Sequence, residues 1–200
     1  MNIVERRAFA DAARAVLARD GRQPLVALFE FVQALPYRFP GPRDAAYTLV
    51  NGWGTCSGKN YLLSELLACA GIPCAHILVA GDLAVNPPAI PPELAAILAE
   101  GSLPDVHSAL TAIGPNGPVT VDASWDPPLA RLGFPVADGW DGTTDTPLAL
   151  APTCVYAVIG PDPTAEKELL RARVFGGHPE LLERRNRYLQ LLSDWIAATR

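Results

Sequence analysis

Apolar residues recur at helical spacing in several segments of the chain, and short apolar or alternating runs separate these segments. The helical pattern covers residues 2–19, 24–35, 55–70, 92–100, 164–173 and 179–198. The strand pattern covers residues 76–80, 106–113, 119–124 and 153–159. Helices come first, strands follow without regular βαβ alternation, and helices return at the end. This order predicts an α+β fold with an antiparallel sheet.

The helix that begins near residue 55 is the best defined of these elements. Thr55 or Ser57 can cap its start, because a hydroxyl oxygen accepts a hydrogen bond from a first-turn N–H group. Four leucines between residues 62 and 67 form a buried stripe, and Gly71 and Pro73 end the helix. Cys56 is therefore expected at the N-terminal end of a buried helix.

Composition and charge narrow the class of protein. The chain has 200 residues, half of them hydrophobic, so we expect one domain, residues 1–200, with a sizeable core. Acidic residues outnumber basic residues by 21 to 16, whereas binding to phosphates needs a basic face, so we expect no nucleic-acid partner. No uncharged apolar run reaches the ~18 residues of a membrane span, and no apolar signal-peptide segment follows the first residues. We therefore expect no membrane association and a cytoplasmic location.

The cysteines and glycines exclude several other kinds of site. The four cysteines lack the dense spacing of disulfide-stapled domains, which favours a reducing compartment. Cys69, Cys74 and His76 match no zinc-ligand pattern, so we expect no metal and no other cofactor. A phosphate-binding loop is excluded because Trp53 and Asn60 occupy positions that the motif G-x-x-x-x-G-K-[ST] reserves for glycine and for serine or threonine.

Cys56 is the strongest candidate for a reactive residue. A helix N-terminus carries partial positive charge and unpaired N–H groups, which stabilise a thiolate, and Lys59 one turn later can add to this effect. The same N–H groups can bind the oxyanion that forms when a thiolate attacks a carbonyl carbon. The alternative is that Cys56 is a small buried hydrophobic residue, as free cysteines usually are.

A predicted hairpin can supply a base and its orienting group. If the strands that flank residues 114–117 join symmetrically, Ala109 pairs with Asp122. His107 and Ala109 share one face of their strand, so Asp122 lies diagonal to His107 at about 7–8 Å, within hydrogen-bonding reach of the two side chains. An imidazole held by a carboxylate is half of a nucleophile–base–orienter triad. The alternative is a core histidine beside a turn aspartate.

These residues resemble the core of the transglutaminase-like superfamily. Three features match the hallmarks of that superfamily: Gly54-Thr55-Cys56 at the start of a leucine-rich helix, Ala70-Gly71-Ile72-Pro73 after it, and His107 and Val121-Asp122 on successive strands. Residues 29–37, which read Phe-Glu-Phe-Val-Gln-Ala-Leu-Pro-Tyr, are similar to the segment that leads into that domain. The resemblance covers residues 25–125. It implies a papain-like α+β fold with a Cys56–His107–Asp122 acyl-transfer triad, to which residues 162–200 add a helical extension.

The chain departs from the superfamily pattern beside the expected substrate channel. Cys74-Ala75-His76 stands where a small residue and arginine are common, and His107-Ser108-Ala109 stands where a small residue and tryptophan usually follow the histidine. These departures concern specificity more than chemistry. Arylamine N-acetyltransferases share the triad and fold, but they are longer and have an Arg-Gly-Gly sequence that is absent here.

The sequence leaves three classes of function open. An enzyme would use Cys56, His107 and Asp122 to hydrolyse or transamidate a peptide or amide bond, and hydrolysis is the default unless the site excludes water. A non-catalytic module would keep the fold and bind a ligand or protein without turnover. An interaction protein would dock through the helix at 179–198. The acyl donor, the acceptor, the second oxyanion donor and the oligomeric state stay open.

The remaining polar and aromatic residues are assigned to structural roles. We expect Cys69 and Cys154 in the core, Arg184-Arg185 on the solvated face of the last helix, and His178 at the end of a loop. The loop segments that contain Trp125 and Trp140 either border the cleft or pack against turns.

Overall fold

The computed structural model describes residues 2–19 and 21–200 of the chain. Its α-helices are α1 (Ile3–Arg19), α2 (Pro24–Gln33), α3 (Ala45–Asn51), α4 (Cys56–Cys69), α5 (Pro92–Ala99), α6 (Pro163–Phe175) and α7 (Pro179–Thr199). Its strands are β1 (Cys74–Asp82), β2 (Pro104–Gly114), β3 (Gly117–Val121) and β4 (Pro152–Ala157). The strands form an antiparallel sheet in the order β3-β2-β1-β4, and a 3-10 helix spans Pro127–Leu132. The predicted α+β class, with the Cys56 helix against an antiparallel sheet, is confirmed.

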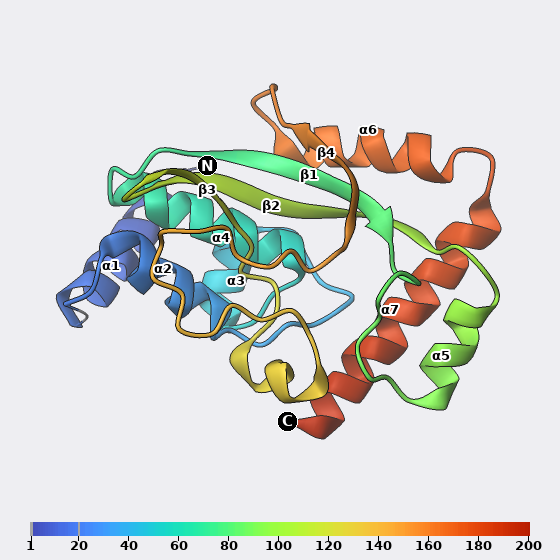
Figure 1. Ribbon diagram of the computed structural model, residues 1–200. Helices are drawn as coiled ribbons and strands as arrows, with labels where there is room; N and C mark the ends of the chain where they lie inside the picture. The colour runs from blue at the N-terminus through green and yellow to red at the C-terminus, as the bar shows by residue number, and fades with distance from the viewer. Residues whose placement is uncertain (1, 20) are drawn as a thin grey trace.

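The helices surround the sheet in three groups (Figure 1). Helix α4 packs against β1 and β2, and α1 and α2 pack against α4. Helices α5 and α7 contact each other at the end of the sheet where β1 finishes and β2 begins. Helix α6 packs against β2 and reaches the sheet from the C-terminal part of the chain. No helix of the described ranges is both long and apolar enough to cross a bilayer.

Helix α4 begins and ends as its sequence predicts. The Thr55 hydroxyl accepts a hydrogen bond from the Gly58 N–H group at 3.1 Å, and Gly71 adopts a φ of 73° just after the helix. The four leucines between residues 62 and 67 are completely buried, and each contributes roughly 1.5–3 kcal/mol by leaving water. Gly58 allows α3 to lie against this helix, because a Cβ there would stand 2.5 Å from the Thr48 hydroxyl oxygen.

The β2–β3 hairpin has the predicted symmetric register. Leu110 pairs with Val121 and Gly114 pairs with Gly117, so Asp122 directly follows the last paired residue of β3. His107 stands seven residues before the end of β2. The tight turn and the strict alternation of strand faces account for this register.

The apolar face of α7 is covered by the protein itself. Tyr188, Leu189, Leu192 and Ile196 are buried in a cluster with α5 and with the segment around Phe134. The apolar stripe at 179–198 is thus explained by packing within this chain. A second cluster, built on α1, α2 and α4, fills the space under β2 and β3.

Four sequence-based expectations about elements and burial were wrong or incomplete. Helix α3 was not predicted, because it is short and only Thr48 of its residues is buried. Cys69 and Cys154 are exposed rather than in the core, since one ends α4 and the other lies on the exposed edge strand β4. Arg185 is buried, not solvated, because its guanidinium forms two hydrogen bonds with Asp105 on β2.

Candidate active site

Cys56 is held at the start of α4 by the segment that precedes it. Gly54 forms a parallel bridge with Tyr37, with the Arg38 N–H group 3.0 Å from the Gly54 oxygen and the Gly54 N–H group 3.1 Å from the Pro36 oxygen. Thr55 then caps the helix, so Cys56 is its first residue. The half-buried thiol lines a cavity of about 480 Å³.

His107 and Asp122 form the hydrogen-bonded pair that the hairpin predicts. Nε2 of His107 lies 2.6 Å from Oδ2 of Asp122, and both residues are 5% exposed. The same carboxylate accepts hydrogen bonds from the Ala149 N–H group, the Asn60 amide and the Ser124 hydroxyl. Burial alone would raise the pKa of Asp122, but His107 and these donors outweigh it and lower the pKa to about 2. Asp122 is therefore an anion that holds the imidazole in one orientation.

Behind this pair lies a buried polar group, here called the inner network, made of Lys59, Asn60, Asp122 and Ser124. The Asn60 amide NH₂ donates to Asp122 and to the Ser108 carbonyl, and its oxygen accepts from the Ala123 N–H group. The amide therefore ties α4 to the end of the β2–β3 hairpin, which fixes the position of Cys56 relative to the His107–Asp122 pair.

Lys59 donates its hydrogen bonds to backbone carbonyls and not to the Cys56 thiol, so it acts on the thiolate only through its charge. Its Nζ atom donates to the carbonyl oxygens of Gln33, Leu35 and Ser124 at 2.7–3.1 Å. Burial lowers the pKa of Lys59, and the carboxylates of Asp126 and Asp122 oppose this. The three carbonyls match the three N–H donors of an ammonium group, so the lysine fastens the end of α2 to α4.

The lysine beside Cys56 is Lys167, which comes from α6. Its Nζ atom lies 3.9 Å from the Cys56 sulfur, 2.8 Å from the Ser57 hydroxyl and 3.0 Å from the Ser108 hydroxyl. Sequence reasoning missed this residue, because it follows Cys56 by 111 positions and lies on a helix that has Phe175 as its only other buried residue. Only the packing of α6 against β2 brings it into the site.

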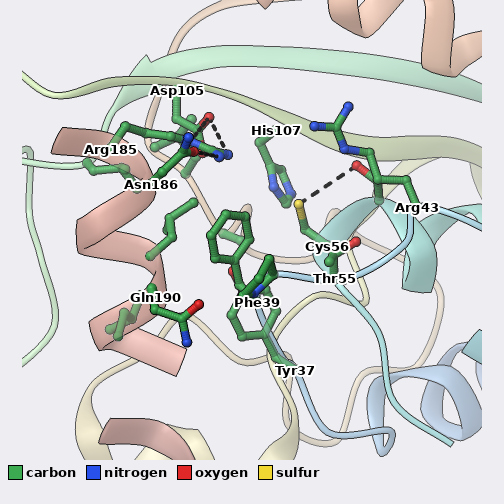
Figure 2. Close-up of a pocket in the computed structure, with 18 of the residues that line it drawn as sticks. Tyr37, Phe39, Arg43, Thr55, Cys56, Asp105, His107, Arg185, Asn186 and Gln190 are labelled. Atoms are coloured by element: carbon green, nitrogen blue, oxygen red, sulfur yellow. Dashed lines mark hydrogen bonds and ion pairs between the residues drawn. The ribbon is translucent and has the colours of Figure 1, made fainter. Parts of the chain in front are cut away.

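The surroundings of Cys56 favour its thiolate, and Figure 2 shows the His107 ring next to the Cys56 sulfur. Burial raises the pKa of Cys56, but the charge of Lys167 and the charge and hydrogen bond of His107 lower it to about 6. Burial lowers the pKa of His107, but Asp122 and Cys56 raise it to about 10. Since Nε2 bonds Asp122, Nδ1 is the ring nitrogen left for the sulfur. The two groups thus stabilise each other's charged form, which favours a thiolate beside an imidazolium.

The cavity in front of Cys56 has aromatic and charged walls. Tyr37, Phe39 and Trp125 line it, which assigns Trp125 to the cleft, whereas Trp140 packs against Phe29 in the core. Asp105 and Arg185 form a buried bidentate ion pair on the far side of His107 from Arg43, as Figure 2 shows.

A second charged group, here called the outer cluster, consists of Arg43, Lys167, Glu168 and Arg171. One carboxylate oxygen of Glu168 accepts hydrogen bonds from both Arg43 and Arg171. The sequence did not indicate these two arginines. Arg43 precedes α3 and Arg171 lies on α6, and they come together only because these distant segments pack side by side. Within residues 2–19 and 21–200, no group of three or more His, Cys, Asp or Glu side chains is arranged to hold a metal ion.

Comparison with known proteins finds a distant structural similarity but no sequence match. Neither the models of protein families nor the curated protein sequences yield a match to the chain. A similar solved structure is a crystal structure described as a "Putative Cysteine Protease" from Cytophaga hutchinsonii, with 15% sequence identity and a TM-score of 0.44. The similarity covers 60% of this chain and 37% of that chain. The aligned part of the present chain thus spans little more than a third of the length of that chain.

Proposed function

We propose that this protein is a cysteine-dependent acyl-transfer enzyme that hydrolyses a peptide or amide bond. The observation that carries the proposal is the juxtaposition of the Cys56 thiol, at the start of a buried helix, with the His107–Asp122 hydrogen bond of 2.6 Å. Burial raises the pKa of a thiol that has no charged partner to stabilise its thiolate, as it raises the pKa of Cys74. At Cys56 the neighbouring charges reverse that direction.

The proposed reaction has two steps. The Cys56 thiolate attacks the carbonyl carbon, and the oxyanion that forms receives hydrogen bonds from first-turn N–H groups of α4. The His107 imidazolium gives its proton to the departing amine as the C–N bond breaks, which leaves a thioester on Cys56 and a neutral imidazole. His107 then takes a proton from water, the hydroxide attacks the thioester, and the carboxylic acid leaves as the thiolate and imidazolium are restored. An amine in place of water would give transamidation as a secondary outcome.

Each remaining site residue has a supporting role in this proposal. Asp122 orients His107 and stabilises its protonated form, as a carboxylate does in other triads. Lys167 acts through Cys56 as an electrostatic positioning residue, because its ammonium group keeps the sulfur ionised when His107 has lost its proton. The proposal places residues 1–200 in one transglutaminase-like domain in the cytoplasm, where four free cysteines remain reduced.

The alternative is a module that binds a peptide or amide ligand without turnover. Its pocket would be the same cavity of about 480 Å³, with the aromatic walls as the binding surface. The alternative leaves the lowered pKa of Cys56 unexplained, so the enzyme is the better proposal.

Substitution of the nucleophile separates the two functions. In assays against libraries of amides, peptides and thioesters, Cys56→Ala should abolish turnover while leaving the unfolding midpoint near that of wild type, because alanine is a good helix former. Cys154→Ala is the matched control, since it removes an exposed thiol and should change neither quantity. Wild-type turnover by Cys56→Ala on any substrate found would refute the mechanism and favour the binding module.

A further inference from the structure

The cavity around Cys56 is basic in a protein that is acidic overall. The described residues that line it include Arg43, Lys167, Arg171 and Arg185, against the single carboxylate of Asp105. The whole chain carries a net charge of −5. The cavity walls therefore carry a local excess of positive charge, although most basic residues lie elsewhere in the chain, and such a local excess attracts anions.

Two of these cations already stand beside negatively charged groups. Arg185 forms its bidentate pair with Asp105 at 2.9 and 3.0 Å. Lys167 stands beside the Cys56 thiolate. Arg43 and Arg171 are left, and they share one oxygen of Glu168, whose side chain is 51% exposed.

The pairing of Arg43 and Arg171 is incomplete. The Nε atom of Arg171 is buried and has no hydrogen-bond partner among the residues that the structure describes, although this side chain is only 11% exposed and lines the cavity. Burial lowers the pKa of Arg43, and the charge of Arg171 lowers it further, so the two guanidinium groups repel each other. A second carboxylate would relieve this repulsion, because planar guanidinium groups bind carboxylates through two parallel hydrogen bonds.

We propose that Arg43 and Arg171 bind a carboxylate of the substrate, so that the enzyme acts on an anionic peptide or amide whose acid group lies within a few bonds of the scissile carbonyl. This inference rests on the proposed role of Cys56 as nucleophile. Figure 2 shows Arg43 on the side of Cys56 away from the Asp105–Arg185 pair. The carboxylate therefore binds at that end of the cavity, and the uncharged part of the substrate extends along Phe39 and Trp125.

Two alkylating reagents of nearly equal size test the inference without a known substrate. Iodoacetate carries a carboxylate and iodoacetamide carries a neutral amide, and in both cases the thiolate sulfur bonds to the carbon as iodide leaves. Both reagents consume the same thiolate, so the ratio of their rates is independent of the thiolate fraction. Peptide mass spectrometry at near-neutral pH gives this ratio separately for Cys56 and for the exposed Cys154 of the same molecule.

The expected ratio of the iodoacetate rate to the iodoacetamide rate is roughly tenfold higher at Cys56 than at Cys154. Arg171→Gln and, separately, Arg43→Gln should each lower the Cys56 ratio several-fold. Arg173→Gln is the matched control, because it removes one positive charge from an exposed position of the same helix and should leave the ratio unchanged.

Three outcomes would overturn the inference. Equal ratios at Cys56 and Cys154, with Cys56 still the faster cysteine toward iodoacetamide, would remove the carboxylate preference and leave the proposed function standing. Slow labelling of Cys56 by both reagents would remove the nucleophile and overturn both proposals. The third outcome comes from competition at constant ionic strength, in which inorganic phosphate or succinate is added during alkylation. Slower alkylation of Cys56 with phosphate but not with succinate would show that the arginines bind phosphate in preference to a carboxylate.

Discussion

The inner network and the outer cluster both carry buried positive charge near Cys56, but they differ in how that charge is satisfied. In the inner network, Lys59 donates to fixed backbone carbonyls and Asp122 accepts from fixed donors. In the outer cluster, Lys167 faces a thiol that can titrate, and Arg171 retains an unpaired Nε atom among the described residues. The inner network is thus suited to hold geometry, and the outer cluster is suited to set the electrostatic potential of the cavity. Their substitution should have different consequences.

The largest expected effect is a loss of stability when Lys59 is replaced. Lys59→Met leaves the carbonyls of Gln33, Leu35 and Ser124 buried without their donor, so the free energy of unfolding should fall by about 3–5 kcal/mol. Urea unfolding followed by circular dichroism measures this change.

Lys167→Met is the matched comparison for this measurement. It should cost distinctly less stability than Lys59→Met, because the hydroxyls of Ser57 and Ser108 lie 3.1 Å apart and still bond each other when the lysine is gone. Equal losses for the two variants would mean that Lys167 is as structural as Lys59, and the distinction between the two groups would fail.

The second largest expected effect is a loss of turnover when Asp122, which orients the proposed base His107, is replaced. Asp122→Asn removes the charge that raises the pKa of His107, and an asparagine cannot accept every hydrogen bond that the carboxylate accepts. Turnover should fall by roughly 10²-fold while some activity remains, because nucleophile and base are still present. The alkaline limit of the rate should also move from about pH 10 to lower pH.

Asp145→Asn provides the control for this experiment. Asp145 accepts a hydrogen bond of 2.7 Å from the Thr120 N–H group of β3, in an exposed position. It is not hydrogen-bonded to His107. Its substitution should leave both the rate and the pH profile unchanged. A matching change in Asp145→Asn would attribute the effect to the hairpin rather than to the histidine.

The smallest effect is a shift in the titration of Cys56 when Lys167 is replaced. Since the pKa of Cys56 is lowered to about 6, the thiolate forms as the pH rises through that value. Loss of a nearby positive charge raises the pKa, so in Lys167→Met the midpoint of iodoacetamide labelling should move to higher pH by about one unit, which is roughly a fivefold slower reaction at pH 6. Lys167→Arg should restore a midpoint near that of wild type. An unchanged midpoint in Lys167→Met would give Lys167 a packing role only.

The parts of the site that could be predicted are those specified by neighbouring residues. The start of α4 follows from Thr55, and the His107–Asp122 pair follows from a tight turn and strand alternation. Both signals act within a few residues, so a sequence pattern contains them. The chemical role of these residues is a different matter and stays a proposal.

The charged walls of the cavity could not be predicted, because they depend on how distant elements pack. Arg185 was assigned to solvent, yet it meets Asp105 across 80 positions of the chain. Lys59 was assigned to Cys56 because it is near in sequence, but the end of α2 holds carbonyls that need a donor, and these take its ammonium group. Proximity along the chain identified the wrong lysine.

The placement of Lys167 on α6 also has a consequence for synthesis of the protein. A nascent chain that has emerged only as far as β4 already contains Cys56, His107 and Asp122, but it lacks the helix that supplies the ammonium group beside the sulfur. Without this charge we expect the pKa of its thiol to be higher than in the finished protein, with fewer thiolates at neutral pH. We expect the growing chain to be protected from premature alkylation and oxidation on the ribosome, with full reactivity acquired only when residues 163–175 dock against β2.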